Sequence, residues 1–309
     1  MKNIGVVGLG SIGMRHAKNL QDAGHQVIAY DPDEKRAIEF MQYRHPDNKN
    51  LPATTATVDE ALTGVDAVIV ASPTDDHSFQ ILTTLVNIPM FVEKPIGASA
   101  SDRIEVAAAI KHSKQPMMVG YNLRYHPCVI QARDWLNGNS VGKIHCANFT
   151  VGQFNQKPAY LRDGVILNWS HEIDLALHLL GPASVVSSAT RLTGGADDLT
   201  DILLRHENDA RSVVHLDYLC RPEIRQTIIA GEDGQIILDL VNRQAWLRGI
   251  DGDLRDHFRA LDTWDDDYKE EIADFINLLD GKGLGFHCTG EQALQVLDIC
   301  LEVRKQAGL

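Results

Sequence analysis

A glycine-rich turn between a short apolar strand and a helix limits this chain to few folds. Residues 4–7 predict a strand buried on both faces, and Gly8, Gly10 and Gly13 follow at G-x-G-x-x-G spacing. In such a turn the first glycine allows the tight bend, the second lets a pyrophosphate approach the backbone, and the third lets the helix pack on the strand. The phosphates would lie at the helix N-terminus, where free N–H groups and the helix dipole favour negative charge.

A second predicted strand, residues 26–30, ends at Asp31. A carboxylate at this position can bind both ribose hydroxyls of NAD, and it repels the 2′-phosphate of NADP. The following Pro32-Asp33 pair offers no arginine or serine for that phosphate, so we expect NAD to be preferred over NADP. The alternative, a glycine turn in an unrelated α/β protein, has no use for Asp31.

The first 120 residues alternate between predicted strands and helices with short links. This alternation predicts a doubly wound parallel sheet, on which ligands bind outside the carboxyl ends of the strands. The helix predicted over residues 75–87 should place Phe79, Leu82 and Leu85 on its inner side. Further strands are expected at residues 54–58, 66–71, 89–92 and 117–120, with helices at 33–45, 59–62 and 99–112.

Lys94 is the most informative side chain at that edge of the sheet. It follows a buried strand and precedes Pro95, so it cannot extend easily into open solvent. A surface lysine is the ordinary alternative, but a positioned ammonium could donate to a substrate hydroxyl and favour its alkoxide character as a hydride leaves. The residues that we expect to contact the cofactor are Gly8, Gly10, Ser11, Ile12, Gly13, Asp31, Ser72, Pro73, Thr74, His77, Glu93, Lys94 and Asn122.

Composition excludes several classes of protein. The 309 residues are enough for two domains, and a net charge of −13 argues against a general affinity for nucleic acid. No apolar run approaches the roughly 20 residues of a membrane helix, and no signal peptide precedes the first strand. The five cysteines contain no C-x-x-C pair, which favours reduced thiols in a cytoplasmic protein over disulfides or a zinc site.

In the second half of the chain, the first candidate site residues lie on a helix predicted over residues 167–181, with Asn168 or Ser170 as its cap. His171, Asp174 and His178 share one face of that helix. Three polar groups on one stripe are compatible with a metal site, a catalytic site or a hydrated surface. The spacing is not H-E-x-x-H, and we predict no metal.

From Ala183 onward, apolar runs alternate with turns, and Glu232-Asp233-Gly234 is a hairpin signal. We expect a large, mostly antiparallel open sheet, followed by helices near residues 266–280 and 290–307. The chain therefore divides into an NAD-binding Rossmann domain, 1–120, and an α+β domain for substrate binding and oligomerisation, 121–309. One face of the sheet stays available for a partner, so a homo-oligomer is expected.

The order of these motifs resembles one known family. The glycine turn, Ser72-Pro73, Glu93-Lys94-Pro95 and the segment 120–127 follow one another as in the Gfo/Idh/MocA family, the group of glucose–fructose oxidoreductase and inositol dehydrogenase. The resemblance covers essentially the whole chain. It implies a nicotinamide cofactor, a sugar, cyclitol or similar polyol as substrate, and a homodimer or homotetramer formed through the second sheet.

The resemblance also implies roles for single residues. The family lysine that matches Lys94 contacts the reacting hydroxyl, and the histidine that matches His171 exchanges its proton, as an imidazole can near neutral pH. Asp174 matches a residue that positions the substrate. Asn122 and Arg124 match positions near the nicotinamide and the substrate.

Departures from the family pattern leave the substrate open. Asn168 stands where an acid is common, and the approach to the helix lacks the usual glycines. Arg162 in this approach could bind a carboxylate or phosphate of the substrate. Two other functions stay possible: a non-enzymatic NAD-binding sensor, and a reductase of a C=N or C=C substrate that does not need the His171–Asp174 pair.

Overall fold

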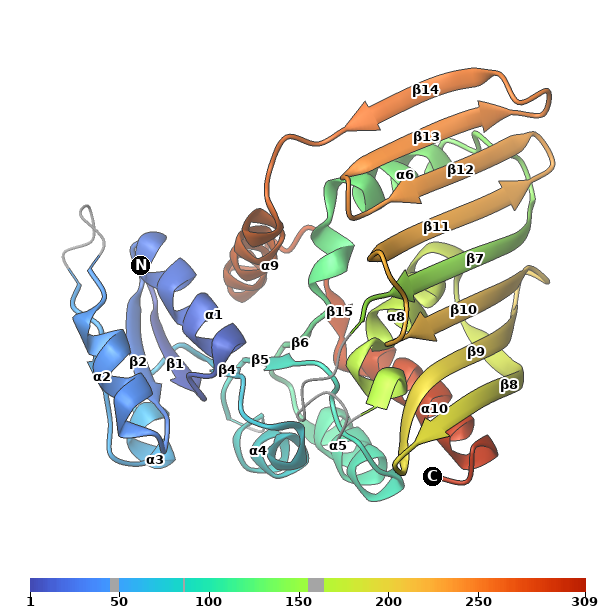
Figure 1. Cartoon of the computed structure of the whole chain (residues 1–309). Coiled ribbons are helices and arrows are strands. Elements are labelled where there is room, and N and C mark those ends of the chain that lie inside the picture. Colours follow the sequence, from blue (N-terminus) through green and yellow to red (C-terminus); the bar gives the residue numbers. More distant parts are fainter. Residues whose placement is uncertain (45–49, 86, 155–163) are drawn as a thin grey trace. The chain divides into compact units, whose positions relative to one another are not determined.

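The chain folds into two compact units, which we describe one at a time (Figure 1). The computed structural model describes residues 1–44, 50–85, 87–154 and 164–309. The first unit joins Met1–Tyr121 with Tyr268–Leu294, and the second joins Asn122–Asp267 with Gln295–Leu309. The linear division into 1–120 and 121–309 therefore differs from these units, because residues 268–294 pack with the N-terminal part.

The first unit contains a seven-stranded sheet in the order β15-β6-β5-β4-β1-β2-β3. All its neighbouring pairs are parallel except β15 with β6. The order reverses between β1 and β4, which confirms the doubly wound arrangement. The strands are β1 (Asn3–Val7), β2 (Gln26–Tyr30), β3 (Ala53–Thr54), β4 (Ala67–Val70), β5 (Met90–Glu93), β6 (Met117–Gly120) and β15 (Cys288–Thr289).

Helices connect these strands, and the central strands β1, β4 and β5 are almost entirely apolar because both faces of the sheet are covered. Ser99 and Asp102 form a capping box at the start of α5, where a serine cap was expected. Helix α9 and helix α10 are each divided between the two units. The helices are α1 (Ser11–Asp22), α2 (Glu34–Gln42), α3 (Val58–Ala61), α4 (His77–Thr84), α5 (Ala100–His112), α9 (Trp264–Leu279) and α10 (Gly290–Gln306).

Helix α4 buries a different face from the predicted one. Phe79 is 67% exposed and Leu82 is 36% exposed, so of the three residues assigned to the core only Leu85 is buried. The buried side chains of α4 include His77 and Ile81, which are one turn apart. The expectation was wrong because the polar ring of His77 occupies an inward position that the hydrophobic pattern assigned to neighbouring residues.

The second unit contains an eight-stranded sheet in the order β14-β13-β12-β11-β7-β10-β9-β8. Only β7 and β10 pair in parallel, which confirms a mostly antiparallel sheet, and the turn at residues 232–234 joins β11 to β12 as predicted. Strand β14 was not predicted, because most of its side chains are exposed. The strands are β7 (Ile144–Gly152), β8 (Ala183–Thr193), β9 (Ala196–His206), β10 (Arg211–Asp217), β11 (Ile224–Gly231), β12 (Gly234–Asp239), β13 (Gln244–Gly249) and β14 (Leu254–Arg259).

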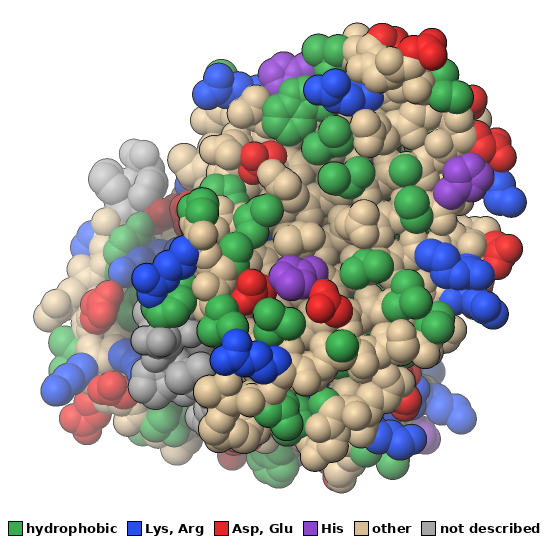
Figure 2. Space-filling view, turned by 45° about the vertical axis from the view of Figure 1, so that its right-hand side comes forward, with side chains coloured by type: hydrophobic (Ala, Val, Ile, Leu, Met, Phe, Trp, Pro, Cys, Tyr) green, Lys and Arg blue, Asp and Glu red, His purple; other side chains and the backbone are tan. Residues whose placement is uncertain are grey.

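One face of this sheet is covered by helices and the other is open. Helix α6 (Pro127–Asn137) contacts β12, β13 and β14, and helix α8 (Ser170–Leu180) contacts β7 and β10 (Figure 1). Figure 2 shows an open face on which hydrophobic side chains lie among polar ones and a histidine stands between two acidic residues. Among the helices that the structure describes, none is long and apolar enough to cross a membrane.

Candidate cofactor and catalytic site

The glycine loop after β1 has the geometry that the spacing predicts. Gly8 has a φ of +93°, and a Cβ there would lie 2.7 Å from the Ala71 carbonyl oxygen. A Cβ on Gly13 would overlap the Gly8 carbonyl, whereas a Cβ on Gly10 would meet nothing within 4 Å. Packing therefore requires the first and third glycines, and the space beside the second is open.

Helix α1 begins at the end of this loop. Gly10 is its N-cap, and no side chain satisfies the first N–H groups. These N–H groups and the open space at Gly10 fit the pyrophosphate of a dinucleotide, which would lie against the backbone on the positive end of the helix dipole. Gly8 to Gly13 would hold that group.

Asp31 lies at the carboxyl end of β2 and is buried against the same loop. Its Oδ2 accepts a hydrogen bond from the Leu9 amide at 2.6 Å, and its Oδ1 accepts one from the Asp33 amide at 2.8 Å. Arg36, with 51% of its side chain exposed, brings Nη1 to 3.5 Å from Asp31 Oδ2. Pro32 and Asp33 offer no arginine, but the first turn of α2 brings Arg36 beside Asp31, a neighbour that the sequence-based expectation did not consider.

His77 has a different position from the one expected of a cofactor contact. Its ring is buried, with Nδ1 2.8 Å from the Pro95 carbonyl oxygen and Nε2 3.0 Å from the Ser72 carbonyl oxygen. Burial lowers the pKa of His77, and a neutral ring donates to only one of the two. His77 thus links the turn at Ser72 to the segment at Pro95. The Ser72 hydroxyl donates a hydrogen bond to Gln80 at 2.6 Å.

The Glu93-Lys94-Pro95 segment follows β5 at the same edge of the sheet. Glu93 Oε1 is 2.6 Å from His16 Nε2, and Glu93 Oε2 accepts a hydrogen bond from the Lys94 amide at 3.3 Å. Gly120 pairs with Glu93 across β5 and β6, and a Cβ there would lie 2.9 Å from Glu93 Oε1. Gly120 therefore leaves the room that the Glu93 carboxylate occupies, and Lys94 is half-buried beside it.

In the second unit, Asp174 and Arg124 face each other. Asp174 is 1% exposed and Arg124 is 3% exposed, with Nη2 2.6 Å from Oδ1 and Nε 2.9 Å from Oδ2. Such a two-pronged pair is a strong charge-assisted interaction. Asp174 was expected to position the substrate and Arg124 to lie near it; in the structure their charged groups bind each other. Asn122 is also buried, two residues before Arg124.

A second ion pair on α8 was missed from the sequence. Arg225 on β11 binds Glu172 through Nε and Nη2 at 2.6 and 3.0 Å. In the sequence, this ion pair is indicated only by the charge of Glu172, which stands next to His171 in a mostly apolar helix. The N-cap of α8 is Trp169, with no side-chain hydrogen bond, so the expectation that Asn168 or Ser170 caps it was wrong. Buried Arg124 and half-buried Arg225 hold this helix through ion pairs.

The polar stripe on α8 is only partly exposed, because Asp174 is buried and both histidines are half-buried. Burial lowers the pKa of His178 to about 3, with Arg124 and Arg133 acting in the same direction. His178 is therefore neutral near pH 7. His171 is half-buried at the start of the helix.

The segment before α8 is fixed by a buried acid that the sequence did not reveal. Asp197 on β9 accepts a hydrogen bond from the Ile166 amide at 2.7 Å, and burial raises the pKa of its carboxyl group. A Cβ on Gly164, whose φ is +71°, would overlap this carboxylate. Gly164 is thus required for the approach to the helix. Arg162 lies outside the described residues.

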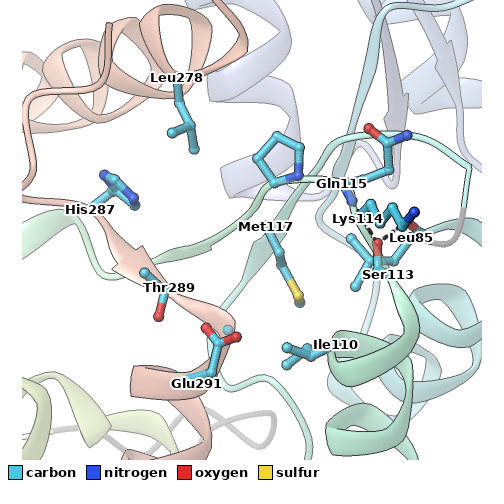
Figure 3. Close-up of a pocket in the computed structure, with 12 residues that line it drawn as sticks. Leu85, Ile110, Ser113, Lys114, Gln115, Met117, Leu278, His287, Thr289 and Glu291 are labelled. Atoms are coloured by element: carbon cyan, nitrogen blue, oxygen red, sulfur yellow. Dashed lines mark hydrogen bonds between the residues drawn. The ribbon is translucent and has the colours of Figure 1, made fainter. Parts of the chain in front are cut away.

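A pocket of about 370 Å³ lies elsewhere in the first unit (Figure 3). Ile110, Met117 and Leu278 line it together with His287 and Glu291. Residues 113–116, which also line it, precede β6, so the pocket is at the amino end of that strand. The glycine loop, Asp31 and Lys94 follow the carboxyl ends of their strands. The pocket is therefore separate from the candidate cofactor site.

The strand order and the glycine loop define the first unit as a dinucleotide-binding Rossmann domain, and the second unit is built on an open, mostly antiparallel sheet. A model described as the oxidoreductase family with an NAD-binding Rossmann fold matches residues 2–121. A model of the GFO/IDH/MocA C-terminal domain matches residues 129–237. The chain belongs to the Gfo/Idh/MocA family of oxidoreductases, which confirms the resemblance found in the sequence.

Similar proteins act on several substrates. The chain is 26% identical over 300 residues to the 2,7-anhydro-N-acetylneuraminate hydratase of Escherichia coli (strain K12), covering 91% of this chain and 78% of that protein. It is 28% identical over 271 residues to the inositol 2-dehydrogenase of Acidothermus cellulolyticus, covering 82% and 76%. A levoglucosan dehydrogenase in complex with NADH and levoglucosan has the same fold, with a TM-score of 0.85, 18% identity and coverage of 99% and 96%.

Proposed function

We propose that the protein is an NAD-dependent oxidoreductase that transfers a hydride between the nicotinamide and the hydroxyl or carbonyl carbon of a sugar, sugar derivative or cyclitol. The observation that carries the proposal is Lys94, at the carboxyl end of β5 on the sheet edge that also bears the glycine loop. Family membership supports it, as do relatives that are named for inositol and levoglucosan.

In the proposed reaction, a small set of residues binds the cofactor and the reacting hydroxyl. When bound, NAD takes up the hydride that leaves the carbon of the substrate alcohol. Gly8 to Gly13 hold the pyrophosphate and Asp31 the ribose. Lys94 donates a hydrogen bond to the substrate oxygen and stabilises its developing negative charge, and His171 accepts the hydroxyl proton. Arg124 and Asp174 act indirectly, by fixing the helix that carries His171.

A substrate panel tests this proposal. The purified protein is mixed with NAD and separate sugars, sugar acids, nucleotide sugars and cyclitols, and the nicotinamide absorbance is followed. Reduction of NAD with at least one of them is expected. If NAD binds but no substrate reduces it, the non-enzymatic sensor is favoured. If NADH instead reduces an imine or a conjugated double bond and His171→Ala retains that activity, the C=N or C=C reductase is favoured.

We also propose that NAD is preferred over NADP. The carboxylate of Asp31 repels a 2′-phosphate, and the guanidinium beside it is already neutralised in part by Asp31 and by Asp33, 3.6 Å away. Titration with NADH and NADPH, followed by cofactor fluorescence, measures both affinities. Tighter binding of NADPH would contradict the preference and would identify Arg36 as the phosphate ligand.

We further propose a homodimer or homotetramer formed through the open face of the second sheet. The strand register aligns a row of outward side chains across six strands: Leu203, Val213, Asn148, Ile228, Ile237 and Trp246. Five of the six are apolar, which is unusual for a face that remains in water. A cytoplasmic location is proposed because all five cysteines are free thiols.

A further inference from the structure

Both chain neighbours of Lys94 are held by buried histidines. His16, from α1, contacts the side chain of Glu93, and His77, from α4, contacts the carbonyl oxygen of Pro95. The two rings come from different helices of the first unit. One contacts the residue before Lys94 in the sequence, and the other contacts the residue after it. Neither ring is exposed, so neither has a direct use at the surface of a cofactor cleft.

The contact between His16 and Glu93 is a hydrogen bond rather than a pair of metal ligands. His16, Glu93 and Glu271 carry potential ligand atoms that all lie within 4.8 Å of one another. Two ligands about 2.1 Å from a tetrahedral ion would lie roughly 3.4 Å apart. His16 Nε2 and Glu93 Oε1 are 2.6 Å apart, which fits a proton between them. The ring also meets Phe91 and Tyr268 edge-on, so its orientation is fixed by packing.

The effect of His16 reaches Lys94 through Glu93. One oxygen of the Glu93 carboxylate faces His16, and the other accepts the Lys94 amide hydrogen. Without the imidazole, this carboxylate could turn away from the Lys94 amide. The contacts with His16 and with the Lys94 amide hold its two oxygens, in the space that Gly120 leaves.

The effect of His77 reaches Lys94 through the backbone. The Nδ1 contact with the Pro95 carbonyl, at 2.8 Å, is shorter than the Nε2 contact with Ser72, at 3.0 Å, so we place the ring hydrogen on Nδ1. Burial disfavours the imidazolium that would serve both carbonyls. The bond that matters for Lys94 is therefore the one from Nδ1.

We propose that His16 and His77 are positioning residues that hold the peptide of Lys94 through Glu93 and Pro95, so that its ammonium is presented at one place. The inference rests on the proposed role of Lys94. Misplacing a reacting group by about 1 Å can reduce turnover roughly 10²-fold, so two supports of this kind would be expected to matter for kcat.

Two pairs of substitutions test the inference, because glutamine places its amide near the Nε2 position of histidine and asparagine near the Nδ1 position. His16→Gln should keep the bond to Glu93, and His16→Asn should lose it. His77→Asn should keep the bond to Pro95, whereas His77→Gln should keep only the contact with Ser72. We expect kcat within about threefold of wild type for the first member of each pair, and about 10- to 10²-fold lower for the second.

Glutamine should be the better substitute at position 16 and asparagine the better one at position 77. General destabilisation would lower kcat without this reversal, so the two explanations can be distinguished. NADH affinity and the thermal midpoint are measured for all four variants and are expected to differ little within each pair. His112→Asn and His112→Gln, on the exposed side of α5, are the matched controls. Equal kcat within both pairs, or the opposite order at either position, overturns the inference.

A double substitution distinguishes this inference from the proposed function. If His16 acts through Lys94, then His16→Asn should change turnover less than about twofold in a Lys94→Ala background, because interacting residues are not additive. A full, additive loss overturns the positioning role. If Lys94→Ala alone retains normal turnover, the proposed function fails, whatever the histidine variants do.

Discussion

Arg124 and Asp174 form a buried ion pair next to His171, the proposed proton acceptor. Their charges neutralise each other in the interior of the second unit, at 2.6 and 2.9 Å. The Asp174 carboxylate, three residues after His171, binds the Arg124 guanidinium at both of its oxygens. The pair therefore fixes the orientation of α8, and with it the direction in which His171 can point.

Asp174→Asn should destabilise the protein. Removing one partner of a buried ion pair leaves the other charge uncompensated, which costs about 3–5 kcal/mol. Urea unfolding followed by tryptophan fluorescence measures the change, because all four tryptophans lie in the second unit. Asp209→Asn, at an exposed ion pair with Arg211, should change the stability by less than about 1 kcal/mol. Equal stability of both variants would contradict the structural role.

Lys94→Ala and His171→Ala should each lower kcat by about 10²-fold or more, because each removes a group that interacts with the reacting hydroxyl. NADH binding, followed by fluorescence, should stay within a few-fold of wild type. Lys111→Ala near the end of α5 serves as the control for loss of a lysine. Normal turnover of either active-site variant would remove that residue from the proposed mechanism.

Among the elements, the start of helix α6 depends on a neutral histidine. His126 Nδ1 accepts a hydrogen bond from the Cys128 amide at 3.2 Å and caps the helix, while Nε2 donates to the Leu240 carbonyl at 3.2 Å. Burial lowers the pKa of His126 to about 3. An imidazolium cannot accept the amide hydrogen, so the cap works only in the neutral form.

Stability should therefore fall with pH below about 6.5. Above that pH the His126 ring is neutral in both the folded and the unfolded state. Below it, the ring binds a proton in the unfolded chain, whereas in the folded chain it stays neutral down to about pH 3. Each such histidine lowers the free energy of unfolding by up to about 1.4 kcal/mol per pH unit in this window.

Urea unfolding at pH 7, 6 and 5 measures this slope. His126→Asn replaces the ring with a capping side chain that does not titrate, so its slope should be smaller than that of wild type. His112→Asn, at an exposed position, should leave the slope unchanged. A wild-type slope in the His126 variant would show that the cap does not contribute to acid lability.

The elements that could be predicted are those whose pattern reports burial on both sides or a specific turn. Strands β1 and β4, the glycine loop and the Ser99 cap follow directly from local sequence. The face of α4 and the existence of β14 could not be predicted, since a buried His77 and a strand with mostly exposed side chains break the hydrophobic pattern. The partners of Asp174 and Glu172 lie about 50 residues away, and local sequence does not report such contacts.

At the scale of the whole molecule, the proposed homo-oligomer would form through the open face of the second sheet. Its apolar row is accompanied by His215, whose ring nitrogens lie 2.7 Å from Asp201 and 3.7 Å from Asp217. Polar groups among apolar ones give an interface its register, and the apolar row supplies its driving force.

Val213→Glu should dissociate the proposed homo-oligomer, because it adds a charge to the centre of this row. Size-exclusion chromatography with light scattering gives the mass of each species. Leu261→Glu, at an exposed side chain outside the sheet, is expected to leave the mass unchanged. A wild-type protein with the mass of one chain, 34.2 kDa, would contradict the proposed oligomer.

The return of residues 268–294 to the first unit affects how the protein can be divided by genetic engineering. These residues supply β15 at the edge beside β6 and Phe275, whose ring lies 5.7 Å from Phe91. A fragment truncated after Tyr121 would expose that edge and leave a hole beside β5. The nucleotide-binding unit is therefore completed only after residues 268–294 have been translated, and a working minimal version would need a circular permutation or a fusion of these residues to the N-terminal part.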